Sequence, residues 1–118
     1  MPKRDAALLV EDIHSALARI VRYTSGVTRE QFLADEKTID AVVRNLEIVG
    51  EAVRWLPEDF KIRHANIAWG QIAGLRNRIV HDYFGLDLEI IWQVLQTSLP
   101  EFKRQVDDIE LDNRTTSH

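Results

Sequence analysis

One short segment, residues 74–85 with the sequence GLRNRIVHDYFG, holds most of the side chains that could do chemistry. Six of them fall between positions 76 and 83: Arg76, Asn77, Arg78, His81, Asp82 and Tyr83. The planar guanidinium of arginine can grip a phosphate with two hydrogen bonds, and an imidazole, with a reference pKa of about 6.5, transfers protons near neutral pH. Arg76 and His81 could therefore cleave a phosphodiester without a metal ion. His81 would handle the proton of a ribose 2′-OH or of the leaving 5′-oxygen, while Arg76 would stabilise charge in the transition state.

The apolar spacing around this segment predicts a helix over residues 68–81. At about 100° per residue, Asn77 and His81 would share one face of that helix, and Arg76 and Tyr83 another. Arg76 and His81 would then lie about 140° apart, so they converge only if the arginine reaches round the helix or its last turn distorts. A histidine at the C-terminus of a helix is also favoured as imidazolium by the helix dipole.

Spacing alone does not decide between a catalytic and a structural interpretation. Arg78 and Asp82, four positions apart, are typical of a surface ion pair, and an arginine and a histidine on one helix are structural more often than not. The four histidines show no metal-ligand spacing, and there are no cysteines, so we predict neither a metal site nor a cofactor.

Other side chains carry weaker signals. Arg54 and Arg44 are candidates for phosphate contacts, and Glu47 and Glu51 for a cleft or a solvated face. Trp55, at a predicted helix end, is a candidate for a partner surface. The remaining aromatic and histidine residues of interest fit structural positions better than ligand-binding ones: Trp69, Trp92, His14 and His64.

Helical periodicity and capping residues predict the elements that must position these groups. The predicted helices cover residues 5–23, a short stretch near 28–33, 36–56, 68–81, and 87–109 with an interruption at Pro100. No segment alternates with a period of two. The expected fold is therefore all-α, an up-and-down bundle of about five helices over residues 1–110, followed by a loose tail at 111–118. Gly50, on the apolar stripe of the long helix, is expected to let another helix approach closely.

Composition is that of a globular domain. The chain has 118 residues, of which 45% are hydrophobic and 29% charged, and this is enough for one core. It lacks a long apolar run, so we expect no membrane span and a cytoplasmic location. The net charge of −4 disfavours nucleic-acid binding by the whole surface, but positive residues concentrate between Arg54 and Arg78.

The pattern Arg76-Asn77-x-x-x-His81-x-Tyr83 resembles the Arg-x-x-x-x-His-x-Tyr motif of the HepT-type toxins, a branch of the HEPN ribonuclease superfamily. The runs NLEIVGEAVRWLPEDFKIRH at 45–64 and IAWGQIAGLRNRIVHDYFGLDLEIIWQVLQTSLPEF at 67–102 are similar to the family core, and the likeness covers roughly residues 5–108. One departure is Asp82, where a small residue is frequent.

The resemblance implies a homodimeric HEPN fold in which the Arg and His of both chains line one cleft. It implies metal-independent endoribonuclease activity on tRNA or mRNA, with Arg76 and His81 catalytic, Asn77 supporting them, and Arg78 and Arg54 available to bind RNA.

The implied biological setting is a type VII-like toxin–antitoxin pair. The partner would be an MntA-like nucleotidyltransferase antitoxin that transfers AMP to Tyr83, where the added bulk and negative charge would block a phosphate-binding site. The alternative is a non-catalytic HEPN binding module that partners a nucleotidyltransferase. A plain structural dimer would leave the polar segment unexplained.

Overall fold

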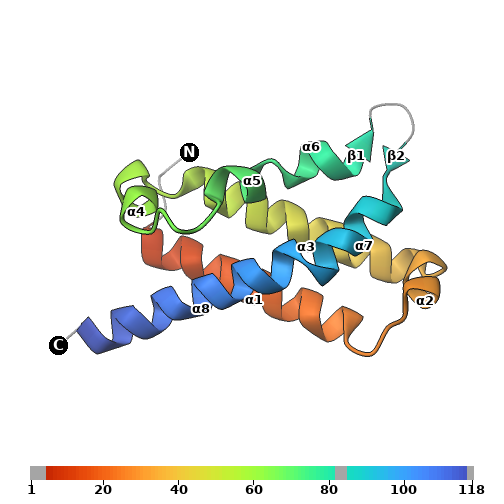
Figure 1. Cartoon of the computed structure of the whole chain (residues 1–118), viewed down its shortest axis with the longest axis horizontal. Helices are drawn as coiled ribbons and strands as arrows, with labels where there is room; N and C mark the ends of the chain where they lie inside the picture. The colour runs from red at the N-terminus through yellow and green to blue at the C-terminus, as the bar shows by residue number, and fades with distance from the viewer. Residues whose placement is uncertain (1–4, 82–84, 117–118) are drawn as a thin grey trace.

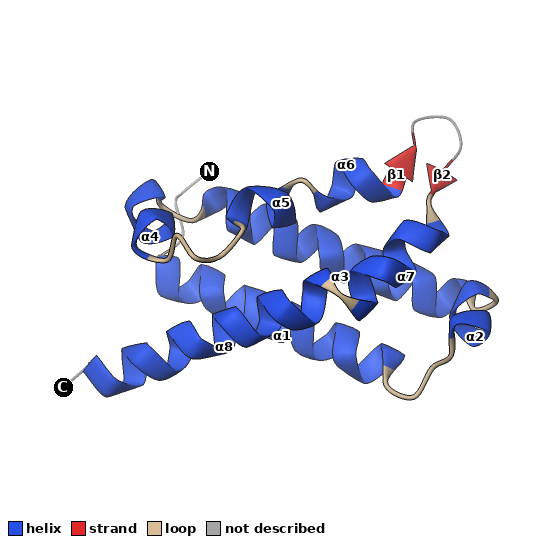
Figure 2. Cartoon of the chain, in the orientation of Figure 1, coloured by secondary structure: helices blue, strands red, loops and turns tan. Residues whose placement is uncertain are grey.

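The computed structural model describes residues 5–81 and 85–116, and at 80, 81 and 110–116 it describes the backbone alone. The helices of the described residues are α1 (Ala6–Thr24), α2 (Arg29–Leu33), α3 (Glu36–Trp55), α4 (Glu58–Arg63), α5 (Trp69–Ala73), α6 (Leu75–Ile79), α7 (Leu88–Gln96) and α8 (Ser98–Thr116). Two short strands, β1 (Val80–His81) and β2 (Gly85–Leu86), pair antiparallel. The prediction of an all-α fold is confirmed, with one small hairpin added to it (Figure 2).

The helices form an up-and-down bundle of four runs (Figure 1). The chain runs out along α1 and back along α3, then out again along α5 and α6, and it returns along α7 and α8. Short α2 and α4 lie at opposite ends of the bundle, where the chain turns. None of the helices in the described part of the chain is long and apolar enough to cross a membrane.

The core lies between α1 and α3 and is closed by the other two runs. Its fully buried side chains include Ile13 and Leu17 of α1, and Val42 and Val49 of α3. Burying each such side chain contributes about 1.5–3 kcal/mol. Asn45 is a buried polar residue in this core, and both polar atoms of its side chain have a partner: Oδ1 accepts from Nε of Arg19 at 2.8 Å, and Nδ2 donates to the carbonyl of Ala41 at 2.8 Å.

Capping side chains begin the long helices where the sequence indicates. Asp5 accepts from the amide of Ala7 at 2.9 Å and begins α1. Asp35 begins α3 by accepting from the amide and hydroxyl of Thr38, and these hydrogen bonds, the hydroxyl's foremost, lower the pKa of the Asp35 carboxyl. Pro57 ends the same helix, since the residue before a proline is pushed to extended geometry.

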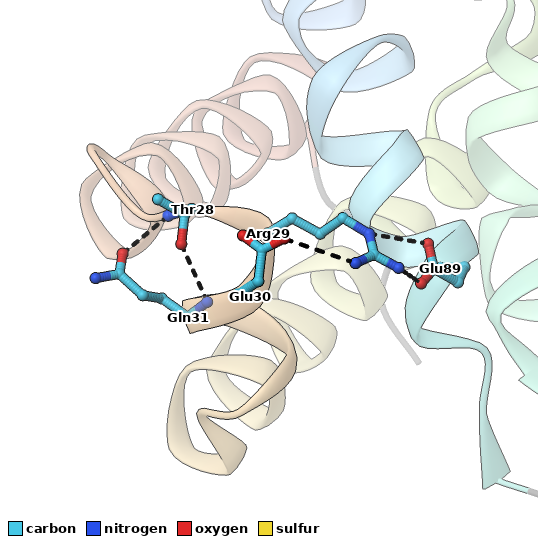
Figure 3. Close-up of polar contacts among 5 residues, drawn as sticks. All are labelled: Thr28, Arg29, Glu30, Gln31 and Glu89. Atoms are coloured by element: carbon cyan, nitrogen blue, oxygen red, sulfur yellow. Dashed lines mark hydrogen bonds and ion pairs between the residues drawn. The ribbon is translucent and has the colours of Figure 1, made fainter.

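A capping box formed by Thr28 and Gln31 begins α2, the short helix predicted near residues 28–33 (Figure 3). The next residue, Arg29, holds Glu89 of α7 through its Nε and a terminal nitrogen, so the ion pair joins segments 60 positions apart (Figure 3). Beneath it Phe32 packs on Trp92, with ring centroids 5.6 Å apart. An exposed ion pair contributes only about 0–1 kcal/mol, so the aromatic contact is the main link between α2 and α7.

Two predicted helix boundaries are wrong. The helix predicted over 68–81 is instead α5 and α6, which meet at Gly74, and it ends at Ile79. The last helix was predicted to end near Ile109 ahead of a loose tail, but α8 continues to Thr116. Residues 110–116 contain neither proline nor glycine, so nothing in the local sequence ends the helix.

Gly50 lies where α5 packs close to α3, as predicted. A methyl group at this position would lie 3.7 Å from the carbonyl oxygens of Ile72 and Ala73. That is ordinary van der Waals contact, so an alanine would also fit, whereas larger side chains would enter the space between the helices.

Candidate active site

A groove of about 690 Å³ runs between α3 and the α5–α6 run. The α3 wall presents successive polar side chains toward it, among them Arg44, Glu47 and Arg54, while Arg76 and Asn77 of α6 line the opposite wall. All five are exposed. The groove therefore brings residues of the segment 74–85 close to residues that lie 22 or more positions earlier in the chain.

The two walls differ in charge. The carboxylates that line the groove all come from α3, and so do two of its three arginines; they are Asp40, Glu47, Glu51, Arg44 and Arg54. The α6 wall contributes Arg76 and the neutral amide of Asn77. A phosphate entering the groove would be attracted by the three arginines and repelled by the three carboxylates of α3, so the α6 wall, which has no carboxylate in the groove, is the more favourable side.

The groove brings together three of the predicted site residues: Arg76, Asn77 and Arg54. Arg78 is not among its lining residues, because two positions along a helix turn a side chain by about 200°. Tyr83 and Asp82 lie outside the described residues. Glu47 and Glu51 line the groove and are also exposed to solvent. The two alternatives left open for them, a cleft and a solvated face, therefore both describe their position.

The predicted helical placement of His81 is wrong. The helix ends at Ile79, and His81 belongs to β1, where its backbone pairs with Gly85. The i,i+4 relation to Asn77 and the favourable helix dipole at His81 are therefore lost. Because the chain leaves the helical path between Arg76 and His81, the angle of about 140° on an ideal helix does not apply to this pair. The structure places the backbone of His81 in the hairpin that follows the groove-lining helix.

Local chemistry explains why the helix stops. Ile79 and Val80 are β-branched, which favours extended geometry. The carbonyl of Ile79 accepts from the backbone amide of Asp87 at 2.7 Å, so it is satisfied without another helical turn. The carboxylate of Asp87 then accepts from the amide of Ile90 at 3.1 Å and begins α7. Sequence reasoning found this cap but missed the hairpin, whose clearest signal was Gly85 six positions after Ile79.

The other weighed residues occupy structural or surface positions. Trp69 is buried against Phe60 and Phe102, as predicted for a core residue. Trp55 is 45% exposed and donates from Nε1 to Glu51 at 3.0 Å. His14 lies 3.3 Å from a carboxylate oxygen of Asp107. No group of three or more potential metal-ligating side chains occurs in the described segments.

Comparison with known proteins decides the family. The chain matches the family model described as "Ribonuclease HepT-like" over residues 13–109. The chain belongs to this family. The HepT resemblance carried by the motif and the core runs is thereby confirmed. No solved structure is found to match the chain.

Relatives of this HepT-like chain extend over nearly its whole length. It is 38% identical over 112 residues to "Putative RNase MJ0127" of Methanocaldococcus jannaschii, covering 95% of this chain and 93% of that protein. It is 40% identical over 101 residues to "Probable ribonuclease HepT" of Thermococcus cleftensis, covering 86% and 92%. "Putative RNase TTE0752" of Caldanaerobacter subterraneus subsp. tengcongensis is 39% identical over 90 residues, covering 76% and 80%.

Gly85→Ala is expected to loosen the hairpin that carries His81. Gly85 has a φ of +78°, which costs a side-chain-bearing residue about 1–2 kcal/mol, and a Cβ there would meet nothing within 4 Å. The amide hydrogen of Asp87 should therefore exchange with solvent on the order of fivefold faster or more.

Gly26→Ala is the matched control, because Gly26 has a φ of +74°, is equally open, and lies between α1 and α2. It should lower overall stability by a similar amount without faster local opening at Asp87. Equal opening in the two variants would show that the hairpin is not an independent unit.

Proposed function

We propose that this HepT-like chain is a metal-independent endoribonuclease, the toxin of a toxin–antitoxin pair. The observation that carries the proposal is the groove in which Arg76, Asn77 and Arg54 are exposed together, beside the hairpin that contains His81. The ribonuclease names of relatives that align along nearly the whole chain support the activity.

The proposed reaction is transfer of a phosphodiester within the RNA strand. The ribose 2′-oxygen attacks the neighbouring phosphorus, the bond from phosphorus to the 5′-oxygen breaks, and the products carry a 2′,3′-cyclic phosphate and a 5′-hydroxyl. His81 handles the proton lost by the 2′-OH or gained by the leaving oxygen, and Arg76 neutralises the additional charge on the phosphorane-like transition state. Asn77, next to Arg76 on the groove wall, supports the placement of the phosphate.

We further propose that the active form is a homodimer in which Arg76 of one copy serves His81 of the other. The α3 wall of the groove supports this, because its carboxylates and arginines lie on one surface. Two copies related by a twofold axis can set each group opposite its counter-charge.

Neutralisation is proposed to occur at Tyr83. An MntA-like nucleotidyltransferase antitoxin would transfer AMP to its hydroxyl, which adds a negative charge and bulk close in sequence to His81. A site that receives RNA phosphates would then be repelled and blocked.

Cleavage of RNA by purified, unmodified protein in EDTA tests the proposed activity. Arg76→Ala and His81→Ala should each lower the rate by about 10²–10⁴-fold, the loss typical of removing a general acid–base or a charge-stabilising group. Arg78→Ala is the control on the same helix, since Arg78 does not line the groove, and it should retain the catalytic rate constant. No cleavage by protein shown by mass spectrometry to be unmodified would support the binding-module alternative.

Tyr83→Phe tests the proposed neutralisation. With the nucleotidyltransferase and ATP, the parent protein should gain the mass of one AMP per chain and lose cleavage, whereas the variant should gain no mass and stay active. Tyr23→Phe, which removes the hydroxyl of the chain's other tyrosine, should behave as the parent. If the Tyr83→Phe protein were still modified and lost activity, neutralisation would act through another residue.

A further inference from the structure

The groove does not end at Arg54. A second hollow of about 560 Å³ continues along α4 and α5, and Arg54 and Ala73 line both. The two hollows therefore adjoin at Arg54 and Ala73, and the second lies toward the α4 end of the bundle, which is at the left in Figure 1.

The two hollows differ in the charge of the side chains that line them. Around the first hollow, carboxylates and arginines balance, but the second is lined by Arg54 and Lys61 against one carboxylate, Glu58. The stem of Lys61 is largely covered, with its side chain 20% exposed, and its ammonium nitrogen lies 4.0 Å from the highly exposed Glu58. The α4 end thus offers more positive charge to a polyanion than the first hollow does.

The rest of the second hollow is apolar. Its lining includes Ile62, Ala65, Ala68 and the largely buried Trp69, and Ile62 is 68% exposed. Cations at the rim and an apolar floor suit an unpaired strand, whose phosphates need the cations and whose base faces need apolar surface. A duplex would present its phosphates but hide its base faces.

Resting on the proposed ribonuclease function, we propose that this second hollow is a substrate subsite that holds single-stranded RNA flanking the cleaved phosphate. In this proposal Arg54, which lines both hollows, contacts the strand between them. Lys61 contacts a flanking phosphate, and the surface around Ile62 packs against a base. Gly70 lines the second hollow but not the first, and it comes six positions before Arg76 in the chain. Because Gly70 does not line the hollow that contains Arg76, a dinucleotide bound at Arg76 is not expected to contact a side chain at position 70.

Gly70 allows a clean test. A Cβ at Gly70 would meet nothing within 4 Å, and its φ is not positive, so substitutions there add groups to the hollow without straining the fold. Gly70→Arg, Gly70→Gln and Gly70→Glu place a positive, a neutral and a negative group at one point, and Gln and Glu are nearly identical in shape. Each is combined with His81→Ala to prevent cleavage, and binding is measured by fluorescence anisotropy.

For an RNA of about 16 nucleotides, affinity should fall in the order Arg, Gln, Glu, with Arg and Glu differing on the order of tenfold or more. The Arg variant should steepen the slope of log affinity against log salt by about 0.7, the value for one added phosphate contact to a single strand. A dinucleotide should bind all three equally, and their thermal unfolding midpoints and assembled masses should match.

The subsite would be overturned by equal affinities of the three variants for the longer RNA, by the same ranking with the dinucleotide, or by a changed assembled mass. A changed rate of Tyr83 adenylylation with unchanged RNA binding would also overturn it, since the hollow would then dock a protein. The parent protein's cleavage separates the two proposals. If the parent cleaves RNA but the three Gly70 variants bind it equally, only the subsite is refuted. If the variants show the expected order of affinities but the parent does not cleave, RNA binding in this hollow is supported and the ribonuclease proposal is refuted.

Discussion

The hydrogen bond from the Asp87 amide to the Ile79 carbonyl, 2.7 Å long, is the constraint on which the candidate site depends. It satisfies the last carbonyl of α6 outside the helix, so the chain leaves the helical path before His81. The carboxylate of the same residue begins α7, which fixes where the chain goes next. Because α7 is held to α2 by the packing of Phe32 on Trp92, the hairpin is tied to the bundle through its base.

α3 is the second constraint, because it serves two purposes along its length. One face carries Val42, Val49 and other buried residues of the core, and the adjoining face forms the charged wall of the groove. Gly50 lines the groove where α5 packs on α3, and its small size leaves room for the carbonyl oxygens of Ile72 and Ala73. The mixed charges from Asp40 to Glu51 suit a second copy of the chain, while the Arg54 end suits RNA. The proposed contact between two copies and the proposed RNA subsite therefore use different parts of α3.

Much of the fold follows from local sequence signals. The apolar stripes, the caps at Asp5, Thr28, Asp35 and Asp87, and the stop at Pro57 each act within a few residues, so their effects can be read directly from the chain. The end of α6 could not be predicted in this way. Ile79 and Val80 fit a helical stripe as well as a strand, and the deciding hydrogen bond comes from a residue eight positions later.

The candidate site was predictable in its residues but not in its shape. The motif places Arg76, Asn77 and His81 in one segment, and the family membership it suggests is confirmed. The opposite wall depends on how α3 packs against α5, which is a long-range contact with no local signal. Consequently Asp40, Gly70 and the continuation of the groove past Arg54 emerge only from the fold.

The central claim, that the groove and hairpin cleave RNA by attack of its own 2′-oxygen, is tested most directly by changing one atom of the substrate. Once the cleaved position is mapped, an RNA with a single 2′-deoxynucleotide on the 5′ side of that phosphate is incubated with unmodified protein in EDTA. The account predicts that this substitution abolishes cleavage there, and that the unsubstituted RNA yields a 2′,3′-cyclic phosphate and a 5′-hydroxyl. Continued cleavage at the deoxy position, with a 5′-phosphate on the product, would contradict it, because water rather than the ribose would then be the nucleophile.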